Sequence, residues 1–129
     1  MGGTGRPAGR RAAGELEGQV MAVLWAADSP LTAAQVLERL PGRLAHTTVL
    51  TILSRLLEKG QLTRQKAGRG HAYAPVRDEA TQMAEGMYQL LEQGSDRRAV
   101  LSRFVSGLSD EDEQVLQELL RHPDPPKRA

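Results

Sequence analysis

Residues 46–60 read HTTVLTILSRLLEKG, and on a helix this stretch has two unlike faces. One face is aliphatic, which predicts packing against a core; it consists of Val49, Ile52, Leu53 and Leu56. The opposite arc carries short hydroxyl side chains and an arginine, where a solvated helix usually has lysine and glutamate. This arc consists of Thr47, Thr48, Thr51, Ser54, Arg55 and Glu58. We interpret it as a binding surface, with a merely solvated face as the alternative.

Two helices are predicted ahead of this one. Apolar residues recur at helical spacing from Leu16 to Trp25, which predicts a first helix over residues 15–27. Thr32 begins a second helix, and Gln35 three residues later completes a capping-box pattern. The second helix ends before the Pro-Gly pair at 41–42, so residues 46–60 form the third helix.

Residues 61–76, QLTRQKAGRGHAYAPV, have the pattern of a β-hairpin. Side chains alternate along both halves, and AGRG supplies a turn that contains glycine. A short segment near Pro30 and Leu31 is free to add a third strand. Three helices followed by a hairpin predict a winged helix-turn-helix, in which the exposed face of the third helix enters the DNA major groove.

The predicted wing is basic around its turn, where Gly68 and Gly70 permit close approach of the backbone to phosphates. Its candidate DNA contacts are Arg64, Lys66, Arg69 and His71. The first 14 residues, MGGTGRPAGRRAAG, lack a helical period and are interpreted as a disordered basic arm. Within this arm, Arg10 and Arg11 are further candidate DNA contacts.

Charge is distributed unevenly along the chain. Residues 1–76 carry ten Lys and Arg against five Asp and Glu, whereas residues 77–129 carry seven against eleven. The net charge of +1 therefore hides a basic half and an acidic half. A basic half favours double-stranded DNA as its partner, with accidental segregation of charge as the alternative.

The acidic half predicts a helical dimerisation domain over residues 77–122, followed by a disordered tail over 123–129. Three amphipathic helices in about 45 residues bury their apolar stripes poorly alone, which favours pairing with a second copy. The residues expected in the dimer interface are Met83, Met87, Leu90, Leu91, Leu101, Phe104, Val105, Leu108, Leu116, Leu119 and Leu120. A monomer whose helices pack back on residues 15–76, the winged helix-turn-helix domain, is the alternative.

Other classes of protein find little support in the sequence. Cysteine is absent, and the three histidines are far apart, so neither a metal site nor a cofactor is expected. No HExxH, GxxxxGK[ST] or GxSxG motif occurs, which argues against an enzyme. No apolar run approaches the roughly 20 residues of a membrane-spanning helix, so we expect no membrane contact and a cytoplasmic location. The predicted fold class is mainly α with a small β-hairpin wing.

Three stretches resemble one known family: GELEGQVMAVLWAADSPLTAAQVLERL, TTVLTILSRLLEKG and QLTRQKAGRGHAYAPV. They are similar to the BlaI/MecI/CopY family of repressors, also called penicillinase repressors, over about residues 14–121. The resemblance implies a homodimeric winged-helix repressor on palindromic operators in front of β-lactam-resistance or related genes. It also implies DNA contact for Thr47, Thr48, Thr51 and Arg55 and for the wing.

The sequence departs from its relatives at two points. Some relatives have basic residues at positions 47 and 50, where this chain has Thr47 and Leu50, so the operator sequence cannot be transferred. The copper-responsive branch carries cysteines in its C-terminal part, and this chain has none, which argues against copper sensing through thiolates.

The resemblance also implies a route of regulation. In the family, a sensor-peptidase pathway leads to cleavage of the repressor next to a phenylalanine, which aligns here with the bond between Arg103 and Phe104. Phe104 is expected to be a core aromatic whether or not the chain is cleaved there. Two rival functions also stay open: a winged helix that binds proteins, and a regulator that senses a ligand between its helices.

Overall fold

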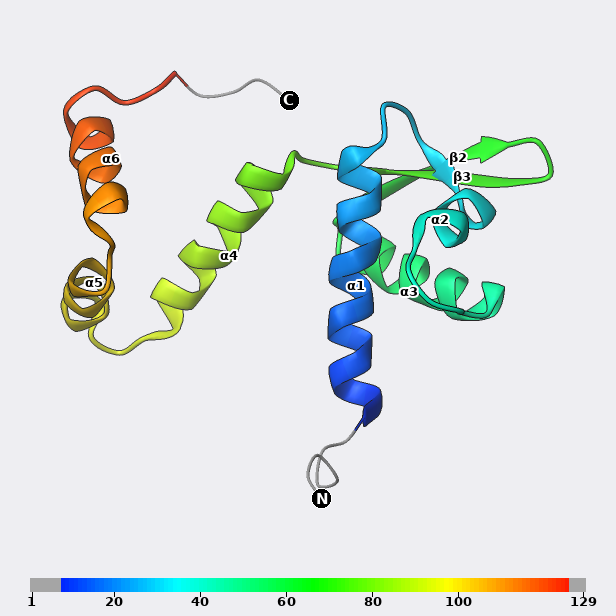
Figure 1. The fold of residues 1–129 in the computed structure, drawn as a ribbon, viewed down its shortest axis with the longest axis horizontal. Coiled ribbons are helices and arrows are strands. Elements are labelled where there is room, and N and C mark those ends of the chain that lie inside the picture. The colour runs from blue at the N-terminus through cyan, green and yellow to red at the C-terminus, as the bar shows by residue number, and fades with distance from the viewer. Residues whose placement is uncertain (1–7, 126–129) are drawn as a thin grey trace. The chain divides into compact units, whose positions relative to one another are not determined.

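The computed structural model describes residues 8–125, with side chains described from residue 14 onward. The chain divides into two compact units, Met1–Asp78 and Glu79–Ala129, here called the first and second unit. The first unit contains α1 (Ala8–Ala26), β1 (Leu31–Thr32), α2 (Ala33–Arg39), α3 (His46–Glu58), β2 (Leu62–Ala67) and β3 (Gly70–Pro75) (Figure 1). Its antiparallel sheet has the order β1-β3-β2. The predicted winged helix-turn-helix is confirmed.

Helix α1 begins earlier than its apolar periodicity predicts. It starts at Ala8, so residues 8–14 are helical rather than part of an arm without secondary structure. The reason is composition, because alanine and arginine in AGRRAAG are among the strongest helix formers and outweigh the glycines. Arg10 and Arg11 therefore lie in α1, although their side chains fall outside the described ones.

The predicted capping box at the start of α2 is confirmed. The Thr32 hydroxyl oxygen accepts a hydrogen bond from the Gln35 backbone N–H at 3.2 Å, and the Thr32 N–H donates to Gln35 Oε1 at 2.9 Å. Leu31 and Thr32 also pair with Tyr73 and Ala72, which makes the short third strand. The dipeptide Leu31–Thr32 thus forms an edge strand of the sheet, and its second residue caps α2.

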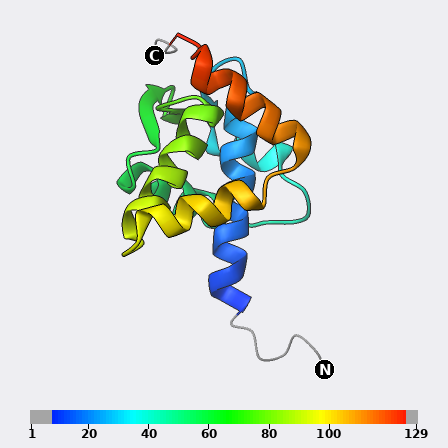
Figure 2. The same ribbon diagram turned by 90° about the vertical axis from the view of Figure 1, so that its left-hand side faces the viewer.

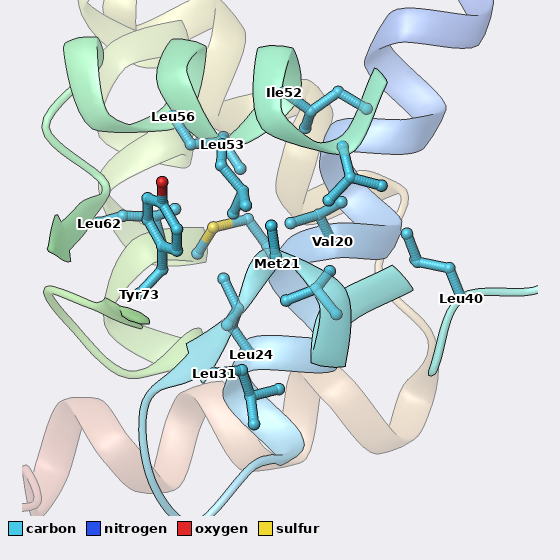
Figure 3. Packing of buried hydrophobic residues seen from close by; sticks show 13 residues of the cluster. Val20, Met21, Leu24, Leu31, Leu40, Ile52, Leu53, Leu56, Leu62 and Tyr73 are labelled. Atoms are coloured by element: carbon cyan, nitrogen blue, oxygen red, sulfur yellow. The ribbon is translucent and has the colours of Figure 1, made fainter. Parts of the chain in front are cut away.

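The core lies where the three helices meet the sheet (Figure 3). Helix α1 supplies Val20, Met21 and Leu24, and α3 supplies the four residues predicted from its periodicity. Leu62 and Tyr73 close the core from the hairpin. Each such aliphatic side chain contributes about 1.5–3 kcal/mol on burial, so this cluster holds the first unit together.

Hydrogen bonds fasten the end of the first unit to its helices. Gly60 has a φ of 77°, which ends α3 in the left-handed conformation expected there. The Arg77 guanidinium donates to the Gly60 carbonyl at 3.3 Å, and the Trp25 indole N–H donates to the Arg77 carbonyl at 3.0 Å. The segment after β3 is therefore tied to both α1 and the end of α3.

The second unit contains α4 (Glu79–Gln93), α5 (Arg97–Ser106) and α6 (Asp110–Arg121). Asp96 caps α5 and Ser109 caps α6, each by accepting from a backbone N–H at 3.1 Å. None of the three helices has a buried residue. Figures 1 and 2 show that they follow one another without closing into a bundle. Over its described residues the unit has regular helices but no buried hydrophobic core.

Phe104 illustrates the limit of the sequence-based expectation. Its side chain is 46% exposed within one chain, and its predicted place in a core shared between two chains stays a prediction. The pattern of an amphipathic helix identifies an apolar face but not the surface that covers it.

Candidate nucleic-acid interface

The exposed face of α3 is built as predicted. Thr47, Thr51, Ser54 and Arg55 are exposed and Thr48 is half-buried, while the opposite face is fixed in the core. Val49 and Leu53 are fully buried directly behind this face. The core therefore orients the helix and leaves its hydroxyl-rich side open to a partner.

Thr51 has a defined hydrogen bond within this face. Its hydroxyl donates to the Thr47 backbone carbonyl at 3.0 Å, one helical turn earlier. With its proton engaged, the Thr51 oxygen is left to accept hydrogen bonds from outside the helix. In a major groove, acceptors of this kind meet the amino groups of adenine or cytosine.

Arg55 lies at one edge of the same face and is exposed. The ion pair between Lys59 and Glu17, at 2.7 Å, does not involve Arg55. The Arg55 guanidinium is thus available to a phosphate or a guanine edge. Lys59, at the end of α3, is instead engaged with α1.

The hairpin places its cations in one row. Arg64 lies opposite Tyr73 and Lys66 lies opposite His71 across the two strands. Because side chains alternate along a strand, Arg64 and Lys66 share the sheet face of Leu62, which is buried in the core. Arg64 and Lys66 are exposed, and His71 is half-buried. The row therefore lies on the same face of the sheet as the core residues, at positions that the helices do not bury.

The wing turn is short and tight. It joins Ala67 to Gly70 through two residues, Gly68 and Arg69, and Gly68 has a φ of 60°. A glycine at the first central position suits the II′ turn of a two-residue hairpin. Arg69 is exposed at the tip, which projects past α2 and α3 in Figure 1.

The charge of the first unit matches this surface. Its sequence carries eleven Lys and Arg against six Asp and Glu, whereas the second unit carries six against ten. A net charge of this sign attracts a polyanion over distances comparable to the Debye length. The structure thus gathers an exposed hydroxyl face, an exposed arginine and a cationic hairpin in one unit with a positive net charge.

Comparison with known proteins gives this surface a context. The model of the family described as "Penicillinase repressor" matches residues 13–122. The chain belongs to the penicillinase repressor family. Two proteins named "Transcriptional regulator BlaI", from Mycobacterium tuberculosis strains CDC 1551 / Oshkosh and ATCC 25618 / H37Rv, are each 40% identical over 113 residues. Those residues cover 83% of this chain and 81% of each relative.

Solved structures show a weaker likeness. A chain of the "Crystal structure of Giardia lamblia Hop2-Mnd1 complex" is 17% identical, with a TM-score of 0.45, over 85% of this chain and 75% of that chain. A MarR family protein from Bacillus stearothermophilus is 18% identical, with a TM-score of 0.41, over 87% of this chain and 79% of that chain. These structural similarities are too weak to support a conclusion about this member of the penicillinase repressor family.

The family is one of transcriptional repressors rather than a class of enzymes, and this chain is accordingly a transcriptional repressor. In the part of the chain that the structure describes, no helix has the length and apolar character needed to cross a bilayer. Groups of three or more His, Asp or Glu side chains placed to hold a metal ion are likewise absent from the described residues.

One exposed residue of this repressor was not selected as a site from its sequence. Leu50 lies on the hydroxyl side of α3 and is 37% exposed. Its angular position, next to Ser54 and Thr47 on the helix, was the signal available.

Proposed function

We propose that this repressor acts as a homodimer on palindromic operator DNA, with α3 in the major groove and the wing on flanking phosphates. The observation that carries the proposal is the exposed hydroxyl and arginine face of α3, which is held rigidly by the core behind it. Short hydroxyl side chains let a helix approach base edges closely. The proposed contacts are Thr47, Thr48, Thr51, Ser54 and Arg55 in α3 and Arg64, Lys66, Arg69 and His71 in the wing, with Arg10 and Arg11 in α1.

The second unit supports the dimer. Large apolar side chains are exposed along all three helices, including Met87 at 55%, Leu90 at 68% and Leu120 at 75%. Exposed apolar stripes of this extent are typical of surfaces that pair with another chain. A second copy is the economical partner, because a two-fold dimer also places two α3 helices on two half-sites. The proposed interface comprises the residues predicted from the amphipathic pattern of α4–α6.

The family description points to the regulated genes. We expect operators in front of penicillinase genes or related β-lactam-resistance genes. Selecting bound fragments from genomic DNA with the full-length chain would identify them. Fragments unrelated to such genes would contradict this part of the proposal and leave DNA binding itself intact.

Binding to DNA is tested by fluorescence anisotropy with random-sequence duplexes at two salt concentrations. If the dimer uses about three basic side chains per subunit on phosphates, the slope of log affinity against log salt should be near −5. Binding that is absent at low salt would contradict the proposal and favour a winged helix that contacts proteins. Sedimentation velocity on the same samples tests the dimer.

Relief of repression by proteolysis is proposed at the bond between Arg103 and Phe104. Both residues are exposed, and α5 has no buried residue. The bond lies inside a helix, so α5 must open locally before a peptidase can bind it in extended form. A sensor-peptidase pathway would then remove α6 from the dimer interface and separate the half-sites.

The cleavage step is tested on repressor recovered from cells before and after induction. Intact-mass measurement should reveal a fragment ending at Arg103 after induction. Repressor that stays full-length while the operator is released would contradict proteolysis and favour an effector ligand.

A further inference from the structure

Leu50 is unusual among the apolar residues of the first unit. Among its described side chains, only Leu50 and Val76 are large hydrophobics that remain exposed, at 37% and 41%. Val76 follows β3 at the end of the unit, whereas Leu50 lies in the middle of α3. The other leucines and isoleucine of α3 are buried or half-buried. An isolated exposed leucine is ordinary on a protein surface, so its position must decide its meaning.

The position of Leu50 is on the face proposed to enter the groove. Thr47 precedes it by three residues and Ser54 follows it by four, so both are its neighbours on the helix surface. Both neighbours have short side chains and are exposed. Leu50 is therefore an exposed apolar side chain at this edge of α3, with His46 one turn before it, and Arg55 lies toward the other edge.

The major groove offers an apolar side chain one natural target. Each base pair presents hydrogen-bond donors and acceptors there, and thymine adds the 5-methyl group. A leucine pressed against donors or acceptors would leave them without partners, at a cost in free energy. A leucine against a thymine methyl group instead removes apolar surface of both groups from water.

We propose that Leu50 reads thymine through its 5-methyl group, so that each half-site requires a T·A pair at the edge of α3 away from Arg55. The inference rests on the proposed DNA binding and adds a base preference to it. Arg55 and Leu50 would then divide the helix into one edge for guanine or phosphate and one edge for thymine.

The experiment begins with duplexes that carry a randomised central segment. Full-length repressor selects its tightest duplex, and each thymine of that duplex is then replaced singly by deoxyuridine, which lacks only the 5-methyl group. One thymine per half-site should weaken binding about four-fold on losing its methyl group. Replacing the symmetric pair in both half-sites should weaken binding about sixteen-fold, because well-separated positions contribute independently.

The variants identify Leu50 as the group that senses the methyl. L50A should bind the thymine and deoxyuridine duplexes with affinities within about two-fold of each other, since little apolar contact is left to lose. V76A removes an apolar side chain of similar exposure from the same unit and should keep the full discrimination. Thermal melting of both variants should match the parent within a few degrees, because neither residue belongs to the core.

The outcomes separate two failures. Two outcomes overturn the role of Leu50 and leave the proposed DNA binding intact. In the first, the wild-type repressor selects a duplex but binds its thymine and deoxyuridine forms equally. In the second, L50A discriminates between these forms as strongly as the wild type. Selection that yields no duplex overturns the DNA-binding proposal, and the inference falls with it.

Discussion

The two units of this chain contain similar amphipathic helices and differ in what covers their apolar faces. In the first unit, fourteen hydrophobic residues between Val20 and Tyr73 are buried. In the second unit, no described residue of α4, α5 or α6 is buried. The sheet makes the difference, because the hairpin and β1 supply a surface on which three short helices close a core.

This contrast separates two ways of using an apolar stripe. A stripe that meets the sheet of its own chain stabilises a rigid reading surface, which DNA recognition requires. A stripe left exposed is available to a second chain. The free energy gained by burying it then stabilises the dimer rather than the single chain, so the stabilisation depends on protein concentration. Stability should therefore be most sensitive to mutation in the first unit, and oligomeric state in the second.

The largest effect is expected from Leu53→Ala. Leu53 is fully buried behind the exposed face of α3, and the cavity left by alanine should lower the free energy of unfolding by about 2–5 kcal/mol. Urea denaturation followed by circular dichroism measures this loss. Leu50→Ala, on the exposed side of the same helix, is the matched control. Equal stability losses in the two variants would show that α3 does not pack as described.

The next effect is expected from Leu120→Asp in α6. Leu120 is 75% exposed within one chain, so the substitution should change the stability of that chain little, but a carboxylate in a dimer interface costs several kcal/mol. Sedimentation velocity should show dissociation into monomers, with operator affinity reduced about a hundred-fold. Gln117→Asp, at an exposed position of the same helix, should remain dimeric. A dimeric Leu120→Asp variant would place the interface elsewhere.

Arg55→Ala should weaken operator binding by roughly 1–3 kcal/mol if the guanidinium holds a base, and should mainly flatten the salt dependence if it holds a phosphate. Anisotropy titrations at several salt concentrations separate the two cases. Arg121→Ala removes the same charge from the second unit and should have little effect. Unchanged affinity in Arg55→Ala would remove this residue from the DNA surface.

A smaller effect is expected from Lys66→Gln in the wing. Losing one phosphate contact per subunit should reduce the salt slope by about 0.9 for each subunit, with a similar loss for every DNA sequence. Lys59→Gln is the control, because Lys59 is already paired with Glu17 at 2.7 Å. If the two lysine variants shift the slope equally, the wing has no special role in holding DNA.

The smallest effect is expected from Trp25→Phe, which removes the indole N–H that donates to the Arg77 carbonyl. One such hydrogen bond contributes about 1 kcal/mol, so the first unit should lose roughly that much stability while the chain stays dimeric. Circular dichroism and sedimentation measure the two quantities. A change in oligomeric state would mean that this hydrogen bond, at the end of the first unit, also affects dimerisation through the second unit.

Local signals in the sequence were sufficient for much of the first unit. The period of α3 predicted all four of its buried residues, and Thr32 with Gln35 predicted the capping box, because both depend on neighbours within one helical turn. The hairpin followed from alternation around its glycines. Contacts between distant residues left no such signal: the Trp25 bond to Arg77 joins residues 52 positions apart.

Other features of the structure could not be predicted from the sequence, for physical reasons that can be named. The start of α1 does not follow from apolar periodicity, because AGRRAAG is helical through intrinsic propensity. The exposure of Leu50 was ambiguous because its angle on the helix falls between the two faces. Only the packing around α3 decides whether such a side chain is buried. In the second unit, periodicity located the apolar stripes, but what covers them depends on a surface outside one chain's sequence pattern.

The hydrogen bond from Thr51 to the Thr47 carbonyl has a consequence for the thermodynamics of recognition. A hydroxyl tethered to the backbone has already lost its rotational freedom when the protein folds, so binding costs it no further conformational entropy. Arg55, exposed and untethered among the described side chains, must give up about 2 kcal/mol of rotamer entropy if it is immobilised on DNA. One helix face thus combines a preordered contact with an adaptable one, and only the second can adjust to differences between operators.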